Sequence, residues 1–151
     1  MRLFSNFEIS GSGLSAQRLR MDVVSNNIAN LNTTRSTEGG PYRRQRVVFE
    51  ARKEDAFILL PGASASASTA GTRLGSGVRV TGVSPDPAPA KLVYDPGHPD
   101  ADAKGYVAMP NINLVNEMVD LISATRAYEA NVAAINSAKS MALKALDIGK
   151  A

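Results

Sequence analysis

Apolar residues recur at helical spacing near both ends of the chain, and each pattern predicts a long helix. Near the N-terminus they lie seven residues apart with a companion row beside them: Phe7, Leu14, Met21, Ile28, Val24 and Leu31. Gly11 and Gly13 each cost roughly 1 kcal/mol relative to Ala inside a helix, so we expect the regular helix to begin near Leu14. The Asn and Thr residues that follow Asn30 compete for backbone hydrogen bonds and predict its end there.

The C-terminal pattern is the longest in the chain and alternates spacings of four and three residues, which is typical of a coiled coil. Its members are Leu114, Met118, Leu121, Thr125, Tyr128, Val132, Ile135, Lys139, Ala142 and Leu146. Asn113 is suited to cap the start of this helix and Gly149 to end it. About 35 residues at 1.5 Å each give a rod of roughly 50 Å. Such a rod is longer than a globular chain of 151 residues needs.

Between the two helical patterns, residues 35–110 carry most of the Pro and Gly together with short β-prone runs at 46–50, 57–60, 77–83 and 91–94. The Ala- and Ser-rich stretch 62–71 has the composition of a linker, so we expect a flexible loop at 61–77. The predicted fold class is therefore α+β: long N- and C-terminal helices that form a coiled-coil-like domain, with a small irregular β domain inserted between them. The expected units are 1–34, 35–110 and 111–151.

Composition limits the function classes. The hydrophobic content of 44% excludes a disordered polar chain, whereas the 5% of aromatic residues, none of them Trp, predicts a core that is thin or shared with other chains. The chain has no Cys, which excludes disulfides and thiolate chemistry. No apolar run is long enough for a membrane span or an ordinary cleaved export signal, so we expect neither.

Two clusters are candidates for binding or catalysis. His98 lies among aspartates in 95–102, but the spaced oxygen ligands of an EF-hand are absent, so we expect a rigid turn rather than a metal or catalytic site. Arg43, Arg44 and Arg46 form a basic patch that Glu50 and neighbouring acids dilute. We expect a solvated or ion-paired edge strand there and keep a small nucleic-acid-binding or regulatory protein as the alternative function. An enzyme centred on His98 is the third hypothesis. No cofactor or metal is expected.

The two helical patterns allow two arrangements. The helices can pair within one chain as a helical hairpin, or they can also pack against other chains. The C-terminal pattern is longer than the N-terminal one can cover, and Thr125 and Lys139 interrupt it with polar residues of the kind that set register and partner choice. Uncovered apolar length at a terminus favours association with other chains.

Two passages carry a family resemblance. The segment 25–34 (SNNIANLNTT) resembles the N-terminal signature of the bacterial flagellar axial proteins, which comprise the rod, hook and hook-associated proteins. The segment 111–131, together with 138–141, resembles the matching C-terminal signature. The segments 38–44 (EGGPYRR) and 94–99 (YDPGHP) are similar to the proximal-rod branch of that family.

The resemblance implies a non-enzymatic structural subunit of the flagellar basal-body rod, which crosses the periplasm and transmits torque to the hook. It implies export through the flagellar type III apparatus without a cleaved signal peptide, and terminal helices that form nested tubes around the export channel. The implied partners are copies of the chain, the rod proteins FlgB, FlgF and FlgG, and the adaptor FliE; neither nucleic acid nor a direct membrane span is expected.

We expect the subunit interface to use the two helical patterns and the amide side chains that fix register where apolar packing is permissive. Its residues are Phe7, Leu14, Met21, Val24, Asn26, Asn27, Ile28, Asn30, Leu31, Leu114, Met118, Leu121, Thr125, Tyr128, Val132, Ile135, Lys139, Ala142 and Leu146.

Overall fold

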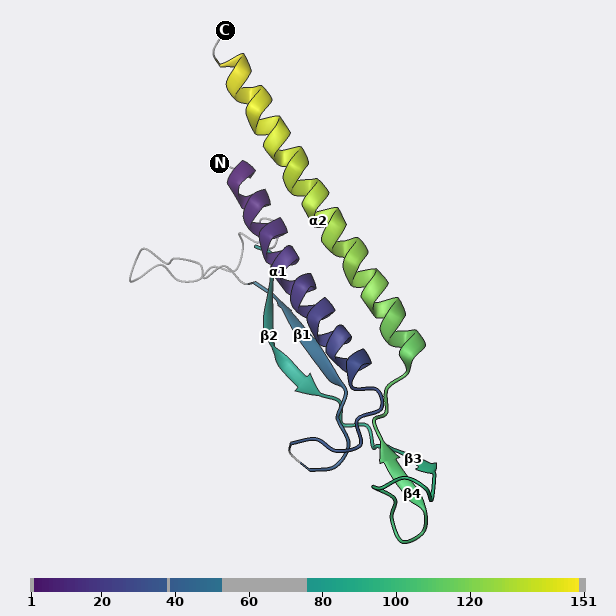
Figure 1. The fold of residues 1–151 in the computed structure, drawn as a ribbon. Helices are drawn as coiled ribbons and strands as arrows, with labels where there is room; N and C mark the ends of the chain where they lie inside the picture. The colour runs from purple at the N-terminus through teal and green to yellow at the C-terminus, as the bar shows by residue number, and fades with distance from the viewer. Residues whose placement is uncertain (1, 38, 53–75, 150–151) are drawn as a thin grey trace, which may run out of the picture.

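The computed structural model describes residues 2–37, 39–52 and 76–149 and has the predicted α+β architecture. Two long helices, α1 (Arg2–Ala29) and α2 (Leu114–Ile148), lie side by side as a hairpin (Figure 1). The strands between them in sequence are β1 (Gln45–Ala51), β2 (Val78–Pro85), β3 (Lys91–Tyr94) and β4 (Tyr106–Met109). Within the chain, the helices therefore pair with each other.

Helix α2 has the ends that the sequence predicts. The side chain of Asn113 caps its start by accepting hydrogen bonds from the backbone N–H groups of Val115 (3.0 Å) and Asn116 (3.3 Å). The N–H of Gly149 donates to the carbonyl of Ala145 at 3.2 Å and ends the helix. With 35 residues against 28 in α1, α2 extends past the start of its partner (Figure 1).

Helix α1 begins at Arg2, so the prediction of a regular helix only from Leu14 is wrong. The reason is the packing of α1 against α2, because tertiary contacts outweigh the helix propensity of single residues. A Cβ atom at Gly13 would lie 3.0 Å from Oδ1 of Asn131, so the missing side chain allows α2 to approach closely. Gly11 has nothing within 4 Å of its Cβ position and shows no such reason for being glycine.

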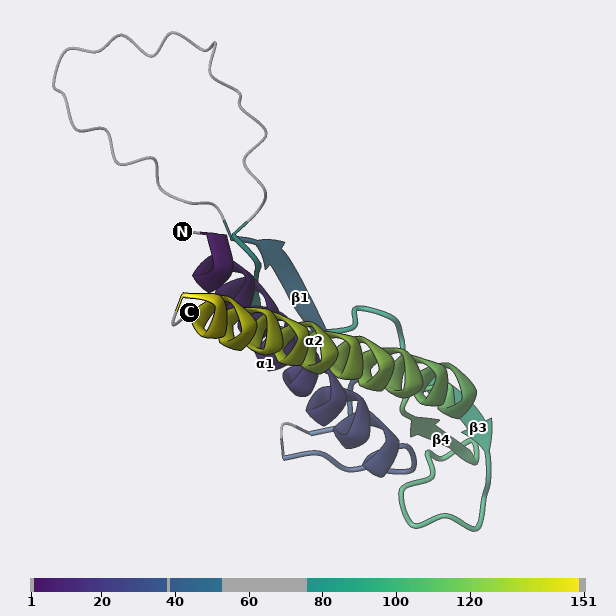
Figure 2. The ribbon, with the colours of Figure 1, turned by 90° about the horizontal axis from the view of Figure 1, so that it is seen from above.

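The strands form two separate antiparallel pairs. Strands β1 and β2 pair with a bulge between Val48 and Phe49, and they pack on α1, which lies between this sheet and α2 (Figures 1 and 2). Strands β3 and β4 pair from Lys91–Met109 to Tyr94–Tyr106 at the opposite end of the molecule from the C-terminus.

The predicted strands at 46–50, 77–83 and 91–94 are confirmed with small changes of their bounds, whereas β4 was not predicted. β4 has only four residues and ends next to Pro110, so it lacks the length that makes alternation visible in a sequence. The predicted strand 57–60 and most of the predicted loop 61–77 lie outside the described residues.

The core is thin, as the composition predicts. Its buried apolar side chains are mostly small: Ala16, Val23, Val24, Val107, Ala124 and Ala138. Among the described residues, no helix has the length and apolar character needed to cross a membrane.

Candidate subunit interface

Asn27, near the end of α1, is a buried hydrogen-bonding centre. Its Nδ2 donates to the carbonyl of Gln45 (2.9 Å) and to Oε2 of Glu117 (3.1 Å). Its Oδ1 accepts from the N–H of Gln45 (2.9 Å) and from the hydroxyl of Tyr42 (3.1 Å). The side chain is 1% exposed, so burying it costs little only because its hydrogen-bonding capacity is filled. Asn27 thus ties α1 to β1 and α2 within the chain, and its role between subunits stays a prediction.

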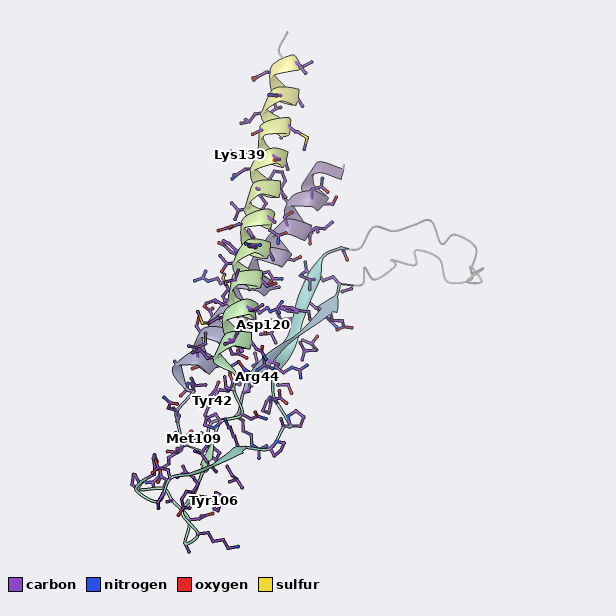
Figure 3. The ribbon with its side chains drawn as sticks, turned by 90° about the vertical axis from the view of Figure 1, so that its right-hand side faces the viewer. Tyr42, Arg44, Tyr106, Met109, Asp120 and Lys139 are labelled. Atoms are coloured by element: carbon purple, nitrogen blue, oxygen red, sulfur yellow. The ribbon has the colours of Figure 1, made fainter. Side chains whose placement is uncertain are left out.

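Charged side chains complete this contact at the base of α2, where Figure 3 labels Tyr42, Arg44 and Asp120. Arg44 Nε lies 2.6 Å from Oε1 of Glu117, which is 1% exposed, and its Nη2 lies 3.5 Å from Oδ2 of Asp120. Asp120 also pairs with Arg20 of α1 at 2.9 Å. We call Arg20, Asn27, Tyr42, Arg44, Glu117 and Asp120 the polar joint. It fixes the β1 end of the inserted unit to both helices.

The electrostatics of the polar joint favour its charged state. Burial by itself lowers the pKa of the Arg44 guanidinium, but the hydrogen bond and charge of Glu117, with Asp86 and Asp120, outweigh burial and raise it above the ordinary value. Burial, and then the charge of Glu117, raises the pKa of Tyr42. Tyr42 therefore stays a hydroxyl that can donate to Asn27 at any physiological pH.

Small side chains line the seam between α1 and α2 above the polar joint. Ala124 and Ala138 of α2 are buried there, and Gly13 lies against Asn131. On α2 these positions follow Glu117 at intervals of seven residues, at 124, 131 and 138. This row lies one residue before the predicted row 118, 125, 132 and 139, so the helices meet on a face rotated from the expected one.

The predicted interface residues divide into three groups by exposure: buried, half-buried and exposed. Val24 and Asn27 are buried within the chain, and Met21 accepts a hydrogen bond from Oγ1 of Thr125 at 3.5 Å. Half-buried positions are Phe7, Leu14, Met21, Ile28, Asn30, Leu31, Leu121, Tyr128, Val132, Ile135 and Ala142. Exposed positions are Asn26, Leu114, Met118, Thr125, Lys139 and Leu146. The exposed group is available to other chains.

A row of large apolar side chains lies on the side of α2 that faces away from the seam. Val115, Met118, Val119 and Ile122 are 67, 51, 61 and 54% exposed, and their spacing of three and four residues places them on one stripe of the helix. We call these four residues the outer face. Only Met118 of the four was predicted as an interface residue.

Sequence reasoning missed the polar joint apart from Asn27. Glu117 is the acidic residue in the first turn of α2, where it lies between Leu114 and Met118 of the apolar pattern. Arg44 is the central residue of a basic patch. A charge within an apolar helical pattern is a signal for a buried pair, but its partner lies 73 residues away in sequence. Only the fold brings the two together.

Known proteins and protein-family models match the sequence of this chain. Two family models match the helical ends: flagella basal body rod protein at residues 7–35, and flagellar basal body rod FlgEFG protein C-terminal at residues 103–148. A flagellar basal-body rod protein FlgC from Borreliella burgdorferi is 52% identical over 98% of both chains. Proteins with the same description from Bacillus subtilis and Escherichia coli O6:H1 are 46% and 44% identical over 99% of this chain and 100% of theirs.

This chain belongs to the FlgC family of flagellar basal-body rod proteins. The resemblance of its two terminal signatures to flagellar axial proteins is thereby confirmed, and the matched family models cover both signatures. Both matched segments contribute to the polar joint, because Asn27 lies within the segment at residues 7–35 and Glu117 within the segment at residues 103–148.

Within the basic patch, Arg44 and Arg46 make ion pairs and Arg43 is exposed. Arg44 lies 3.5 Å from Asp86 in addition to its partners in the polar joint, and Arg46 lies 4.0 Å from the same carboxylate. Acidic partners reduce the positive potential that would attract phosphates. Neither these contacts nor the family matches give support to the nucleic-acid-binding alternative.

His98 lies in a closed turn between β3 and β4. Its Nδ1 accepts a hydrogen bond from the N–H of Asp100 at 3.1 Å, and Asp100 is engaged by Thr34 (2.8 Å) and by Arg35. The hydrogen bond from Thr34, and then Arg35, lower the pKa of Asp100 despite partial desolvation. In the described part of the chain no three His, Cys, Asp or Glu side chains gather in a way that could hold a metal ion. The aspartates around His98 thus brace the turn.

Proposed function

We propose that this structural subunit of the flagellar basal-body rod assembles through the exposed side of its helical hairpin, with the outer face of α2 as the principal contact to neighbouring subunits. The observation that supports this proposal is the exposure of the outer face, where four large apolar side chains on one stripe of α2 are about half or more exposed. Full burial of a large apolar side chain is worth about 1.5–3 kcal/mol, and these four have about half to two thirds of their surface left to bury. Contiguous exposed apolar stripes of this kind are typical of protein interfaces.

The hairpin suits a shaft that carries torque. Helix α2 has 35 residues, and α1 supports most of its length through the seam. Because the polar joint connects both helices to β1, a load on the helices passes to the inserted unit without a flexible link at that point. The function is structural, and we propose no enzymatic activity for the chain.

Membership of the family implies association with other basal-body rod components. More specifically, we propose that the neighbours include copies of the chain, FlgB, FlgF, FlgG and the adaptor FliE. We further propose that the chain reaches the periplasmic rod through the flagellar type III export apparatus, and that its helices line the export channel. The resemblance of both terminal signatures to axial proteins supports this arrangement.

The deciding experiment changes the outer face without touching the seam. Met118→Asp places a charge in the proposed contact, and we expect loss of incorporation into basal bodies and loss of swimming. Asn116→Asp adds the same charge in the same turn, away from the outer face, and is the matched control. Both residues are exposed, so circular dichroism of the purified chains should be unchanged. Normal incorporation of the folded Met118→Asp chain would refute the proposal.

A further inference from the structure

The backbone around His98 restricts the turn between β3 and β4. The rings of Pro96 and Pro99 lock their own φ angles, and Pro99 also restricts the backbone of the residue before it, His98. The N–H of His98 donates to the carbonyl of Asp95 (3.3 Å), and its carbonyl accepts from the N–H of Ala101 (3.1 Å). The side chain of His98 is half-buried. A change of charge on this imidazole therefore acts on a turn that has few other conformations to adopt.

The imidazole of His98 makes a hydrogen bond that depends on its protonation state. Its Nδ1 lies 3.1 Å from the backbone N of Asp100. A backbone N–H can only donate, so Nδ1 must accept, and the neutral ring then carries its proton on Nε2. Protonation of Nδ1 would place a second donor against the N–H of Asp100 and break the bond. This conformation of the turn therefore requires neutral His98.

The side chain of Asp100 connects the same turn to the segment that follows α1. Its Oδ2 accepts a hydrogen bond from the hydroxyl of Thr34 at 2.8 Å, and its Oδ1 pairs with Nη2 of Arg35. The hydrogen bond from Thr34, and then Arg35 and the charge of His98, lower the pKa of Asp100 despite partial desolvation. The carboxylate therefore stays ionised throughout the range of pH 5 to 8 in which histidines change their charge.

We propose that His98 is a pH-sensitive latch: the neutral ring holds Asp100 against Thr34 and Arg35, and the protonated ring draws the Asp100 carboxylate away from them. The imidazolium donates from Nδ1, and its charge acts on that carboxylate. A charge-assisted hydrogen bond from His98 then competes with the one from Thr34 for the same group. The latch is closed near pH 8 and open near pH 5. It does not depend on the outer face and goes beyond the proposed function.

The ionisable groups near the latch give each state of the ring a partner. Within the described residues they come from the turn, from the two strands that it joins and from the segment after α1: Asp95, Asp100, Asp102, Lys104, Tyr94, Tyr106 and Arg35. Oδ1 of Asp95 is already occupied by the N–H of Gly97 at 3.2 Å, and the rings of the two tyrosines pack edge to face on each other. The aspartates offer negative charge to an imidazolium, whereas the N–H of Asp100 offers a hydrogen bond to the neutral ring.

Because the chain contains one His, nuclear magnetic resonance of the full chain follows the latch without overlap from other imidazoles. Near pH 8, the nitrogen chemical shifts of the ring should show the proton on Nε2. Between pH 8 and pH 5 the ring should become protonated. Over the same range, we expect the protection of the Asp100 amide against hydrogen exchange, corrected for the intrinsic rate, to fall roughly fivefold, as the loss of one hydrogen bond predicts.

His98→Asn is the matched control. Its Oδ1 can accept the N–H of Asp100 as Nδ1 of His98 does, but it does not titrate, so the protection of the Asp100 amide should stay the same at both pH values. Thr34→Val then tests the connection to the segment after α1. It should lower the urea midpoint near pH 8 in both chains, and near pH 5 only in the chain that also carries His98→Asn.

A proton on Nδ1 near pH 8, or a ring that is still neutral near pH 5, would overturn the latch. So would unchanged protection of the Asp100 amide in a chain whose His98 has become protonated. An equal loss of protection in the His98→Asn chain would assign the pH dependence to another group and refute the role of His98. If Thr34→Val lowered the midpoint of the chain with His98 equally at both pH values, protonation would leave the Thr34 contact intact and the proposal would fail. The titration uses the unchanged chain, so it decides the matter even if a variant does not fold.

Discussion

The two sides of α2 differ in a way that reverses the usual distribution of residues in a self-contained protein. The side that faces α1 buries Ala124 and Ala138 together with Glu117, whereas the opposite side exposes Val115, Met118, Val119 and Ile122. A chain that folded only for itself would place its large apolar side chains in the seam. Small and polar residues are thus buried between the helices, and the exposed apolar side is the one that we propose as the contact with other chains.

The small side chains in the seam have a physical consequence for how the two helices pack. Small side chains allow two helices to approach closely, and Gly13 against Asn131 shows how little space remains between them. Such a seam gains less from the hydrophobic effect than one lined by Leu, so specific polar contacts carry more of the orientation. The polar joint supplies these contacts at one end. Stability should therefore depend on the joint and the seam, and assembly on the outer face.

The largest expected effect on stability comes from breaking the polar joint. Glu117→Ala removes the closest partner of Arg44, which keeps only the longer contacts to Asp86 and Asp120, and it leaves the buried Nδ2 of Asn27 with one of its two hydrogen bonds unfilled. Breaking a buried pair in this way costs about 3–5 kcal/mol of the free energy of unfolding. Urea denaturation of the full chain, followed by circular dichroism, measures it.

Glu129→Ala is the matched control for the joint, because Glu129 lies on the same helix and is exposed. Its effect should stay within about 0.5 kcal/mol, as for surface substitutions in general. A Glu117→Ala chain as stable as the Glu129→Ala chain would contradict the idea that the joint holds the two helices and the inserted unit together.

A smaller effect is expected in the seam, where two glycines two residues apart have opposite roles. Gly13→Leu forces a side chain against Asn131, and overpacking of this kind costs about 1–3 kcal/mol. Gly11→Ala meets nothing within 4 Å and removes a helix-weakening residue, so it should stabilise the chain by up to about 1 kcal/mol. Thermal unfolding of the two variants beside the unchanged chain tests the contrast. A melting temperature of the Gly13→Leu chain that is unchanged or raised would show that α1 does not depend on close approach at Gly13.

The sequence predicted the elements better than the faces on which they meet. The ends of α2 follow from Asn113 and Gly149, whose roles are local and depend on residue type. The start of α1 could not be placed, because Gly11 and Gly13 reduce helix propensity whereas the packing that compensates for Gly13 is with a residue 118 positions away. In the same way, the row Met118, Thr125 and Val132 and the row Glu117, Ala124 and Asn131 are neighbouring stripes of one helix, and periodicity alone favours the row with the larger apolar side chains.

The interface prediction shows the same limit. Met118 and Leu146 were correctly placed on helical stripes, but the sequence could not tell which stripe the chain covers itself. That choice depends on Glu117 finding Arg44 and Asn27, a contact between segments far apart in the sequence. A pattern of residue types shows which residues are candidates for such a contact, but it does not show which of them pair with each other.

The smallest expected effect concerns the turn at Asp100, which lies outside both the seam and the outer face. Thr34 and Arg35 lower the pKa of Asp100 in the folded chain, so its carboxylate stabilises the fold above its unfolded pKa of about 4, and this contribution is lost as the pH falls through the lowered folded value. Asp100→Asn should therefore lower the urea midpoint at pH 7 slightly, and the effect should shrink as the pH falls towards 2.5. Thr34→Val removes the first partner and should lower the midpoint at pH 7 in the same direction. If Asp100→Asn instead lowered the midpoint equally at both pH values, the loop would depend on the shape of the side chain rather than its charge, and the turn would join the seam as a region held by packing.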